Sequence, residues 1–301
     1  NTKKDTGNPM YSTLHVNIPK EIMGFPFTPF STATGSSFST HTEVQEHLKE
    51  YADTHCLHKM VRYGTEVTCI TRDSGQAWTV TSTSTSTSTS TSTSTSGGSG
   101  NDSGSETFDY VLVANGHFSE RNFPTAAQLG PDADIGGTNM AAYQIDSRHT
   151  TLHSADYDGP HMPDSTAFHP TSTGYTEGVS VSAPLFTGKS VLIVGGRNSA
   201  TDLAREISAV ATVVHCSDRS MAAGESAAAG ESGSEGGSDG SGGSSRGFDE
   251  HSNLRHYPGI RLYHADSREV EFLCGSRVQA DVLIWCTGFK YSLPFLQGKE
   301  Q

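Results

Sequence analysis

The stretch VLIVGGRNSATDLAREI, residues 191–207, decides the fold class because it predicts a strand, a glycine turn and a helix in direct succession. Its first four residues are apolar and mostly β-branched, which is typical of a buried parallel strand. Two glycines follow, and apolar residues then recur at helical spacing: Ala200, Leu203, Ala204 and Ile207. Such a turn brings backbone N–H groups at a helix N-terminus against a pyrophosphate. We therefore predict an α/β fold with a dinucleotide-binding, Rossmann-like unit.

The glycine turn matches the dinucleotide fingerprint G-x-G-x-x-G/A imperfectly. The six residues are Gly195, Gly196, Arg197, Asn198, Ser199 and Ala200, and Arg197 stands at the position of the second glycine. We predict that these residues bind the nucleotide phosphates, with the Arg197 cation beside them. The alternative interpretation of the same residues is a plain strand–helix turn.

A second strand, expected over 211–216, ends at three polar residues, Ser217, Asp218 and Arg219. They follow the glycines by about 20 residues, where a Rossmann unit handles the ribose 2′ position. An acidic residue there suits the free hydroxyl of NAD, whereas Ser with Arg suits the 2′-phosphate of NADP. We predict NADPH, bound through Ser217 and Arg219. Asp218 keeps NAD open, and a solvated strand end is the alternative for all three.

Composition narrows the class of protein. The chain has 301 residues, enough for one large or two medium domains, and its formal net charge of −13 argues against nucleic acid as a partner. No apolar run reaches the roughly 18 residues of a membrane span, so no transmembrane segment is predicted. Because the first residue is Asn1 rather than Met, we expect a processed product or a fragment. We also expect a cytoplasmic location.

The pattern of cysteines and histidines does not predict a metal centre. Five cysteines without a CxxC pair argue against a disulfide scaffold or a zinc module. Four histidines fall in one segment, His149, His153, His161 and His169. A metal site is one interpretation of this segment and surface histidines in a loop are the other. We favour the second and predict no metal ligand.

Two segments have too little apolar surface to offset the entropy of ordering, so we predict disordered insertions there. They are the Thr-Ser repeat with its Gly/Ser-rich continuation, 81–106, and the Ala/Gly/Ser-rich stretch 222–247. A long surface loop is expected over 158–184. The other expected elements are a helix over 43–52 and strands over 65–70, 77–80, 108–114, 260–263, 269–274 and 282–285.

Two of the expected strands end alike. Residues 111–117 are VLVANGH and residues 283–289 are LIWCTGF, so each apolar strand is followed by a small or polar residue, a glycine and a ring. Each glycine lets the backbone pass close to a neighbour as the chain leaves the sheet. Such paired ends resemble the linker strands of flavoproteins with two dinucleotide domains.

From about Met10 to Leu296 the chain resembles flavin-containing monooxygenases, the fungal type in particular. Four blocks carry the resemblance: LHVNIPKEIMGFP at 14–26, YVLVANGHFS at 110–119 with NFP at 122–124, GGRNSATD at 195–202 and CTGFKYSLPF at 286–295. In these blocks the family has Thr-Asn-x-Pro-Lys-Glu, a strand ending in Thr-Gly-His-Tyr, its NADPH turn and Thr-Gly-Tyr-x-Tyr-Ser-x-Pro-Phe.

Departures from the family pattern accompany the resemblance. The identifying motif Phe-x-Gly-x-x-x-His-x-x-x-Tyr/Phe is present only in its second half, at His153 and Tyr157, because Ser147 and His149 hold the Phe and Gly positions. The first βαβ unit of the family, with its FAD pyrophosphate turn, is absent from this sequence. We therefore expect the N-terminal FAD unit and the C-terminal part to be missing, so that this chain binds NADPH and holds FAD weakly.

The resemblance implies FAD and NADPH as cofactors. It also implies O₂ and a small-molecule substrate whose soft N or S atom is oxygenated, as in an N,N-dimethylaniline-type monooxygenase. It gives Asn17 a catalytic role near the flavin and nicotinamide, for which a turn-forming Asn is the alternative. Four residues are expected to approach FAD, where Asn115 stands for the usual Thr: Asn115, Gly116, Thr287 and Gly288.

The implied architecture is a FAD domain interrupted by an NADPH domain. We expect 1–146 as a partial FAD-binding domain, 147–280 as the NADPH-binding domain and 281–301 as the return strand to the FAD domain. Two other functions stay open: a related N-hydroxylating or Baeyer–Villiger monooxygenase, and a catalytically inactive nucleotide-binding fragment. The block from Asn17 to Glu21 favours a flavin-containing monooxygenase over an N-hydroxylating or Baeyer–Villiger enzyme. The absent FAD turn favours the inactive nucleotide-binding fragment.

Overall fold

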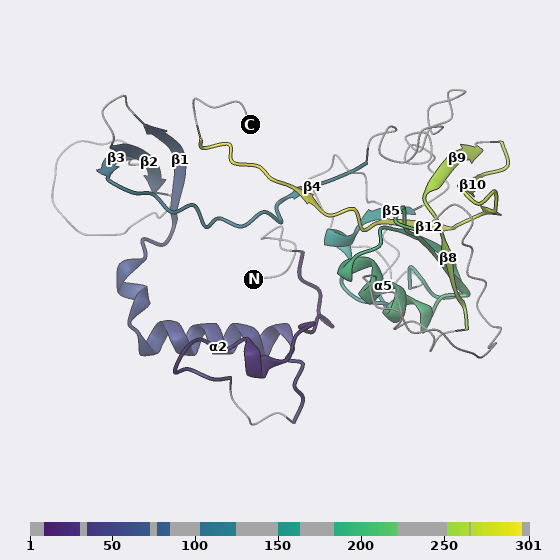
Figure 1. Cartoon of the computed structure of the whole chain (residues 1–301), viewed down its shortest axis with the longest axis horizontal. Coiled ribbons are helices and arrows are strands. Elements are labelled where there is room, and N and C mark those ends of the chain that lie inside the picture. Colours follow the sequence, from purple (N-terminus) through teal and green to yellow (C-terminus); the bar gives the residue numbers. More distant parts are fainter. Residues whose placement is uncertain are drawn as a thin grey trace, which may run out of the picture. The chain divides into compact units, whose positions relative to one another are not determined.

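A computed structural model describes most of the chain in two compact units. Unit 1 comprises Asn1–Leu14 and Phe118–Lys290, and unit 2 comprises His15–His117 and Tyr291–Gln301 (Figure 1). The described residues are 9–30, 35–72, 77–84, 103–124, 150–162, 184–221, 252–264 and 266–296. The expected insertion 222–247 and most of the expected loop 158–184 lie outside them.

Unit 1 is built on a five-stranded sheet in which every neighbouring pair is parallel. In spatial order its strands are β5 (Thr150–His153), β12 (Val282–Trp285), β6 (Ser190–Val194), β7 (Val213–Ser217) and β8 (Leu254–Tyr257). β6 is followed directly by helix α5 (Asn198–Ser208). The strand, glycine turn and helix expected over 191–207 are therefore present, and the fold is of the α/β, Rossmann type.

The central strands β6, after its first residue Ser190, and β12 are apolar because both faces of the sheet are covered. Val191 and Ile193 pack with Leu203 and Ile207 of α5 on one face, all four fully buried. Leu192, Leu283 and Trp285 pack on the other face against an antiparallel meander of β9 (Ile260–His264), β10 (Glu269–Phe272) and β11 (Arg277–Val278). Full burial of side chains of this size is worth about 2 kcal/mol each, so the two cores hold the unit together.

The ends of β6 and β12 approach each other so closely that only glycine fits between them. Gly195 has φ +142°, and a Cβ atom placed on it would lie 2.3 Å from the carbonyl oxygen of Cys286. A hydrogen bond from Cys286 N–H to Val194 O (2.8 Å) joins the ends of β12 and β6. A second one, from Gly195 N–H to Ser217 O (2.9 Å), joins the end of β6 to that of β7. A side chain at this position would push the two strand ends apart.

A short two-stranded ribbon continues from the sheet within unit 1. It pairs β4 (Glu120–Arg121) antiparallel with β13 (Phe289–Lys290). The chain after β5 forms the 3₁₀ turn η3 (Ser154–Asp156), and the carboxylate of Asp156 forms an ion pair with Arg121. The connections through 118–124 and 286–290 are thereby tied to the carboxyl end of the parallel sheet.

Unit 2 contains a capped helix and an antiparallel sheet. Helix α2 (His41–Thr54) covers the expected helix and begins at a capping box, in which Thr40 and Glu43 bond each other's backbone N–H groups. The sheet consists of β1 (Thr65–Arg72), β2 (Trp78–Ser84) and β3 (Ser103–Phe108) in that order. The remaining elements are the 3₁₀ turns η1 (Lys20–Ile22) and η2 (Leu57–Met60).

The prediction that 81–106 forms no structure is wrong at both ends. Residues 81–84 extend β2 and residues 103–106 belong to β3, where Thr81 pairs with Ser105. Alternating Thr has β propensity, and the ladder with β1 supplies the partner that the repeat lacks by itself. The middle of the segment, 85–102, lies outside the described residues.

The strand expected over 108–114 is also wrong as placed, because β3 ends at Phe108. Residues 109–116 make no backbone hydrogen bond to any part of the chain that the structure describes. Tyr110 is 88% and Leu112 95% exposed. A strand exists only where a neighbouring strand satisfies its N–H and C=O groups, and none of the described residues does so here.

We predict that Gly195→Ala destabilises unit 1 strongly. The added Cβ overlaps Cys286 O and the φ of +142° is strained for alanine, so we expect a loss of about 3 kcal/mol or more in the free energy of unfolding. Urea unfolding followed by the fluorescence of the fully buried Trp285 measures it.

The matched control for this variant is Gly275→Ala. Gly275 also has positive φ (+83°), but no atom lies within 4 Å of its Cβ position. Only backbone strain remains there, so about 1 kcal/mol is expected. Equal losses for the two variants would contradict the close contact of β6 with β12.

Candidate functional site

The candidate site lies at the carboxyl edge of the parallel sheet, between β6 and β12. In the sheet, β7 and then β8 lie on one side of β6, in the order in which they follow it along the chain. On the other side of β6 lie β12 and then β5. In open α/β sheets such a reversal of strand order is where ligands bind. The turn that follows β6 begins at Gly195 and Gly196, and the turn that follows β12 contains Thr287 and Gly288. The sequence-predicted residues of unit 1 therefore meet at this edge.

The turn after β6 presents backbone N–H groups to this edge. Helix α5 has Arg197 as its N-cap, with no side-chain cap and no acidic residue in its first turn. The N–H groups of residues 196–200 make no hydrogen bond within the described parts of the chain. Orphan N–H groups and the helix dipole both favour an anion at this place. Arg197, Asn198 and Ser199 are exposed, whereas Ala200 is 5% exposed and packs in the core under the helix.

Asp218 lies directly against the glycine turn. A Cβ atom placed on Gly196 would fall 2.0 Å from Oδ2 of Asp218, so the missing side chain of Gly196 makes room for this carboxylate. Its Oδ1 accepts the backbone N–H of Ser220 (2.9 Å), which fixes the turn after β7. An acidic group at the end of the second strand occupies the place at which Rossmann units meet the ribose hydroxyls.

Ser217 and Arg219 differ in their surroundings. β7 runs one residue further than expected, so Ser217 pairs with Val194 and Tyr257 inside the sheet. It is 2% exposed, and its hydroxyl donates to Pro258 O (3.0 Å). Arg219 is exposed and its guanidinium makes no ion pair or hydrogen bond among the described residues. Of the expected pair, Arg219 is the one available to a solvent-borne phosphate.

The turn after β12 is held by the segment around Asn122. The Thr287 hydroxyl donates to Asn122 O, and the Asn122 side-chain amide donates to Thr287 O (3.1 Å). The Gly288 carbonyl, at φ +77°, accepts both Asn122 N–H (3.0 Å) and His153 Nε2 (3.0 Å). The carbonyl groups of Thr287 and Gly288 therefore point into the fold, and their N–H groups make no hydrogen bond among the described residues.

His153 is a neutral donor at the centre of this arrangement. Its Nδ1 accepts Ala155 N–H (3.2 Å), which leaves the proton on Nε2 for Gly288 O. The ring meets Phe123 and Phe289 edge to face at 5.4 and 5.2 Å. Burial is the main cause that lowers the pKa of His153 to about 4. Asn122 had no role predicted from the sequence, and its only signal was its place in the second resemblance block.

The other sequence-predicted site residues lie in unit 2. Asn17 is exposed on a loop that is held by hydrogen bonds from Val16 N–H to Ser39 O (2.9 Å) and from Lys20 N–H to Ser37 O (2.7 Å). Asn115 is exposed, and Gly116 has φ +74° with open space around its Cβ position. The fixed loop presents the Asn17 amide to its surroundings without an internal partner among the described residues.

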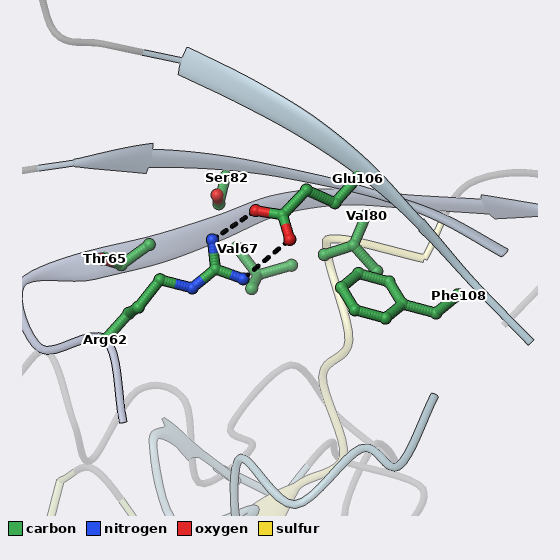
Figure 2. A pocket seen from close by; sticks show the side chains of 7 residues that line it. All are labelled: Arg62, Thr65, Val67, Val80, Ser82, Glu106 and Phe108. Atoms are coloured by element: carbon green, nitrogen blue, oxygen red, sulfur yellow. Dashed lines mark hydrogen bonds and ion pairs between the residues drawn. The ribbon is translucent and has the colours of Figure 1, made fainter. Parts of the chain in front are cut away.

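One pocket in unit 2 contains none of the predicted site residues. It has a volume of about 170 Å³ on one face of the sheet β1–β3 and is lined by Arg62, Thr65, Val67, Val80, Ser82, Glu106 and Phe108. Figure 2 shows the Arg62 guanidinium facing the Glu106 carboxylate in a two-pronged ion pair, with Val80 and Phe108 beyond it. The pairing lowers the pKa of Glu106 and raises that of Arg62, so both groups stay charged and face each other.

The described residues hold no group of three or more His, Cys, Asp and Glu side chains arranged to bind a metal ion, while His149 and His169 lie outside them. Among the same residues, none of the helices combines the length and the apolar character that crossing a membrane requires.

We predict that His153 makes unit 1 less stable in acid. Its pKa is about 4 in the folded chain against 6.5 unfolded, so the unfolded chain binds the proton first as the pH falls. Stability is complete above pH 6.5 and falls by about 3 kcal/mol towards pH 4. Urea unfolding midpoints between pH 7 and 4.5 measure the slope. His153→Gln keeps a side-chain donor without the titration and should reduce the slope to about half, since burial also lowers the pKa of His215 in the same unit to about 4. An unchanged slope would contradict the burial of a neutral His153 imidazole.

Comparison with known proteins agrees with this fold. The family model described as flavin-binding monooxygenase-like matches residues 1–161. The flavin-containing monooxygenase FMO GS-OX-like 1 of Arabidopsis thaliana is 28% identical over 294 residues, covering 96% of this chain and 47% of the relative. The chain thus spans about half the length of the curated relatives it matches.

Solved structures give the same result. The S-allyl-L-cysteine S-oxygenase from Allium sativum has a TM-score of 0.62 at 25% identity, covering 96% of this chain and 51% of that one. A flavin monooxygenase from Stenotrophomonas maltophilia, at 18% identity and a TM-score of 0.56 over 95% of this chain and 67% of that one, shares the fold. The family consists of flavin-binding oxidoreductases. The chain belongs to the flavin-binding monooxygenase-like family, which confirms the resemblance found in its sequence.

Proposed function

We propose that this chain is the nucleotide-binding and linker part of a monooxygenase that uses NADPH, FAD and O₂ to oxygenate a soft nucleophilic N or S atom of a small molecule. The observation that carries the proposal is the uncapped N-terminus of α5 behind the Gly195–Gly196 turn, placed where the strand order reverses. Among the relatives, the Allium sativum protein is named as an S-oxygenase, which favours sulfur over nitrogen as the atom oxygenated.

The residues at the turn fit the phosphates of NADPH. The free N–H groups of 196–200 suit the pyrophosphate, and Arg197 adds a cation at the same edge. Arg219 is the exposed cation for the 2′-phosphate, with its planar group of donors. Asp218 suits a ribose hydroxyl, so NADH binding is the second candidate, favoured by the contact of that carboxylate with Gly196.

The proposed FAD-binding residues are Asn115, Gly116, Thr287 and Gly288, acting through backbone groups. The carbonyl groups of Thr287 and Gly288 are engaged inside the fold, so their N–H groups are the ones available to a flavin. The exposed apolar segment 109–114 fits a central strand of a FAD-domain sheet whose neighbours come from outside the described residues. We keep the domain assignment on this basis: 1–146 and 281–301 with FAD, 147–280 with NADPH.

In this proposal the cofactors supply the redox chemistry and the protein supplies binding, orientation and exclusion of water. NADPH is the hydride donor and O₂ the source of the oxygen atom. Asn17 offers both a donor and an acceptor on one exposed amide, which suits it to hold a flavin oxygen together with a bound water.

Two alternatives are distinguished by the whole protein's products. An N-hydroxylating or Baeyer–Villiger monooxygenase would oxygenate a primary amine or a ketone rather than a thioether or a tertiary amine. A catalytically inactive nucleotide-binding protein would bind NADP⁺ at the turn without consuming NADPH. The departures at Ser147 and His149 favour this last alternative, whereas the exposed Asn17 on its fixed loop favours an active enzyme.

We predict that Arg219→Ala weakens NADPH binding about tenfold or more and NADH binding by less than about threefold, because a charge-assisted contact to the 2′-phosphate is lost. Calorimetric titration of each nucleotide into the chain measures both. The matched control is Lys189→Ala, which removes one exposed cation at the opposite end of β6. Equal losses of NADPH and NADH affinity would show that Arg219 does not discriminate.

We predict that Asn17→Ala in the whole protein lowers product formation by about tenfold or more and leaves NADP⁺ affinity within about twofold, because the turn after β6 is untouched. Product per NADPH consumed is measured with a thioether and with a tertiary amine. Unchanged product formation would remove Asn17 from the proposed site and return it to the role of a turn-forming residue.

A further inference from the structure

The carbonyl groups of the turn that follows β12 all have neighbours inside unit 1. Cys286 O lies against Gly195, where an added Cβ atom would come within 2.3 Å of it. Thr287 O accepts the side-chain amide of Asn122 at 3.1 Å, and Gly288 O accepts the backbone N–H of Asn122 at 3.0 Å. The N–H groups of Thr287 and Gly288 make no hydrogen bond among the described residues. The turn therefore offers donors, and not acceptors, to a ligand.

The direction of these donors follows from the planar trans peptide group, in which N–H and C=O point in opposite directions. None of the peptide bonds in the described residues is cis. Because Thr287 O points at the Asn122 amide, Gly288 N–H, which belongs to the same peptide group, points away from Asn122. The contact of Cys286 O with Gly195 turns Thr287 N–H away from Gly195 in the same way. What the carbonyl groups contact thus decides where the N–H groups point.

Gly288 is the residue at which this orientation can be lost. Its φ is +77°, and no atom beyond its chain neighbours lies within 4 Å of its Cβ position, so packing around that position does not hold it. Glycine adopts positive and negative φ about equally readily. Rotation of the peptide group between Thr287 and Gly288 would therefore cost little free energy by itself. The rotated peptide group would offer a carbonyl oxygen where the N–H now lies.

One side-chain contact opposes this rotation. Asn122 Nδ2 donates to Thr287 O, and a carbonyl oxygen can pair only with the nitrogen of an amide side chain, which defines the orientation of the Asn122 amide. The Thr287 hydroxyl donates back to Asn122 O. That second bond holds the Thr287 side chain but leaves the following peptide group free to turn. Among the described residues, the Asn122 amide is thus the group that holds the peptide between Thr287 and Gly288.

We propose that Asn122 is a positioning residue, whose side-chain amide keeps the peptide group between Thr287 and Gly288 turned so that Gly288 N–H is available to a ligand. Without the amide, a carbonyl oxygen can take the place of this donor and repel an electron-rich atom of the ligand. The orientation of the peptide group follows from contacts within unit 1 alone. That the ligand is FAD rests on the proposed function, in which Thr287 and Gly288 bind it through their N–H groups.

The first test measures the backbone at Gly288 in the 301-residue chain without any cofactor. Nuclear magnetic resonance of the isotope-labelled chain gives the couplings between Gly288 N–H and its two Hα protons, which depend on φ. We expect the couplings of a single positive φ in the wild type. In Asn122→Ala, which removes only the side-chain amide and keeps the backbone bond to Gly288 O, we expect couplings averaged over positive and negative φ.

The matched control is Asn253→Ala, because Asn253 also bonds backbone carbonyl groups of unit 1 through its side-chain amide. Its Nδ2 donates to Ser208 O (2.9 Å) and Ala211 O (3.0 Å), at the C-terminal end of α5. Loss of this amide should leave the couplings of Gly288 unchanged. A second variant, Asn122→Asp, keeps the size of the side chain but has no donor when it is ionised, so it should behave like Asn122→Ala.

The second test measures cofactor affinity in the whole protein. We expect Asn122→Ala to weaken FAD binding about tenfold, the effect of losing one hydrogen bond to the cofactor. NADP⁺ affinity should stay within about twofold, because the turn of residues 196–200 is untouched. Titration of the FAD-free protein, followed by flavin fluorescence, measures the first affinity, and calorimetry measures the second. Asn253→Ala should leave both affinities within about twofold.

Couplings of a single positive φ at Gly288 in both Asn122 variants would overturn the proposal. Averaged couplings in Asn253→Ala would also overturn it, because they would show a general loosening of unit 1. If Asn122→Ala does not fold, as judged by Trp285 fluorescence, Asn122→Asp decides the question. Averaged couplings together with an unchanged FAD affinity would support the role of Asn122 in the backbone and contradict the proposed contact of the turn with FAD.

Discussion

The arrangement of unit 1 depends on the close contact at Gly195 between the ends of strands β6 and β12. Strands β6 and β12 lie side by side in the sheet although about 90 residues separate them in the sequence, and their ends meet where no Cβ atom fits. This contact creates the reversal of strand order at which a ligand site can exist. It also places the N-terminus of α5 and the turn at Thr287–Gly288 on the same edge.

Two sets of interactions surround this contact: apolar packing and polar hydrogen bonds. The apolar faces of β6 and β12 provide the stability, since their alternate residues enter separate cores on the two sides of the sheet. Polar contacts provide the geometry of the edge: Asn122 and His153 engage the carbonyl groups of the turn after β12. The same turns therefore keep their N–H groups for a ligand, which is the chemistry an anionic dinucleotide requires.

Elements that are defined by a local sequence pattern were predicted correctly. Elements that depend on residues distant in the sequence were not. Residues 191–207 carry a complete local pattern, so strand, turn and helix were predicted correctly. The apolar stretch 108–114 has the composition of a buried strand, but strand formation depends on neighbours that no local pattern supplies. β7 continues one residue further than expected, so Ser217 lies inside a sheet whose two faces are both covered, and its side chain is buried rather than exposed at the strand end. The hydrogen bonds from Tyr11 and Thr13 to α5 join residues about 190 positions apart, which spacing alone could not reveal.

The central claim is that the turn of residues 196–200 binds the phosphates of a dinucleotide. Amide hydrogen exchange of the chain, with and without NADP⁺, tests it most directly because the N–H groups in question are the ones measured. We expect slower exchange in peptides covering 196–200 and no change in the sheet β1–β3 of unit 2. Unchanged exchange at the turn, or protection confined to the pocket beside Arg62 and Glu106, would contradict the account.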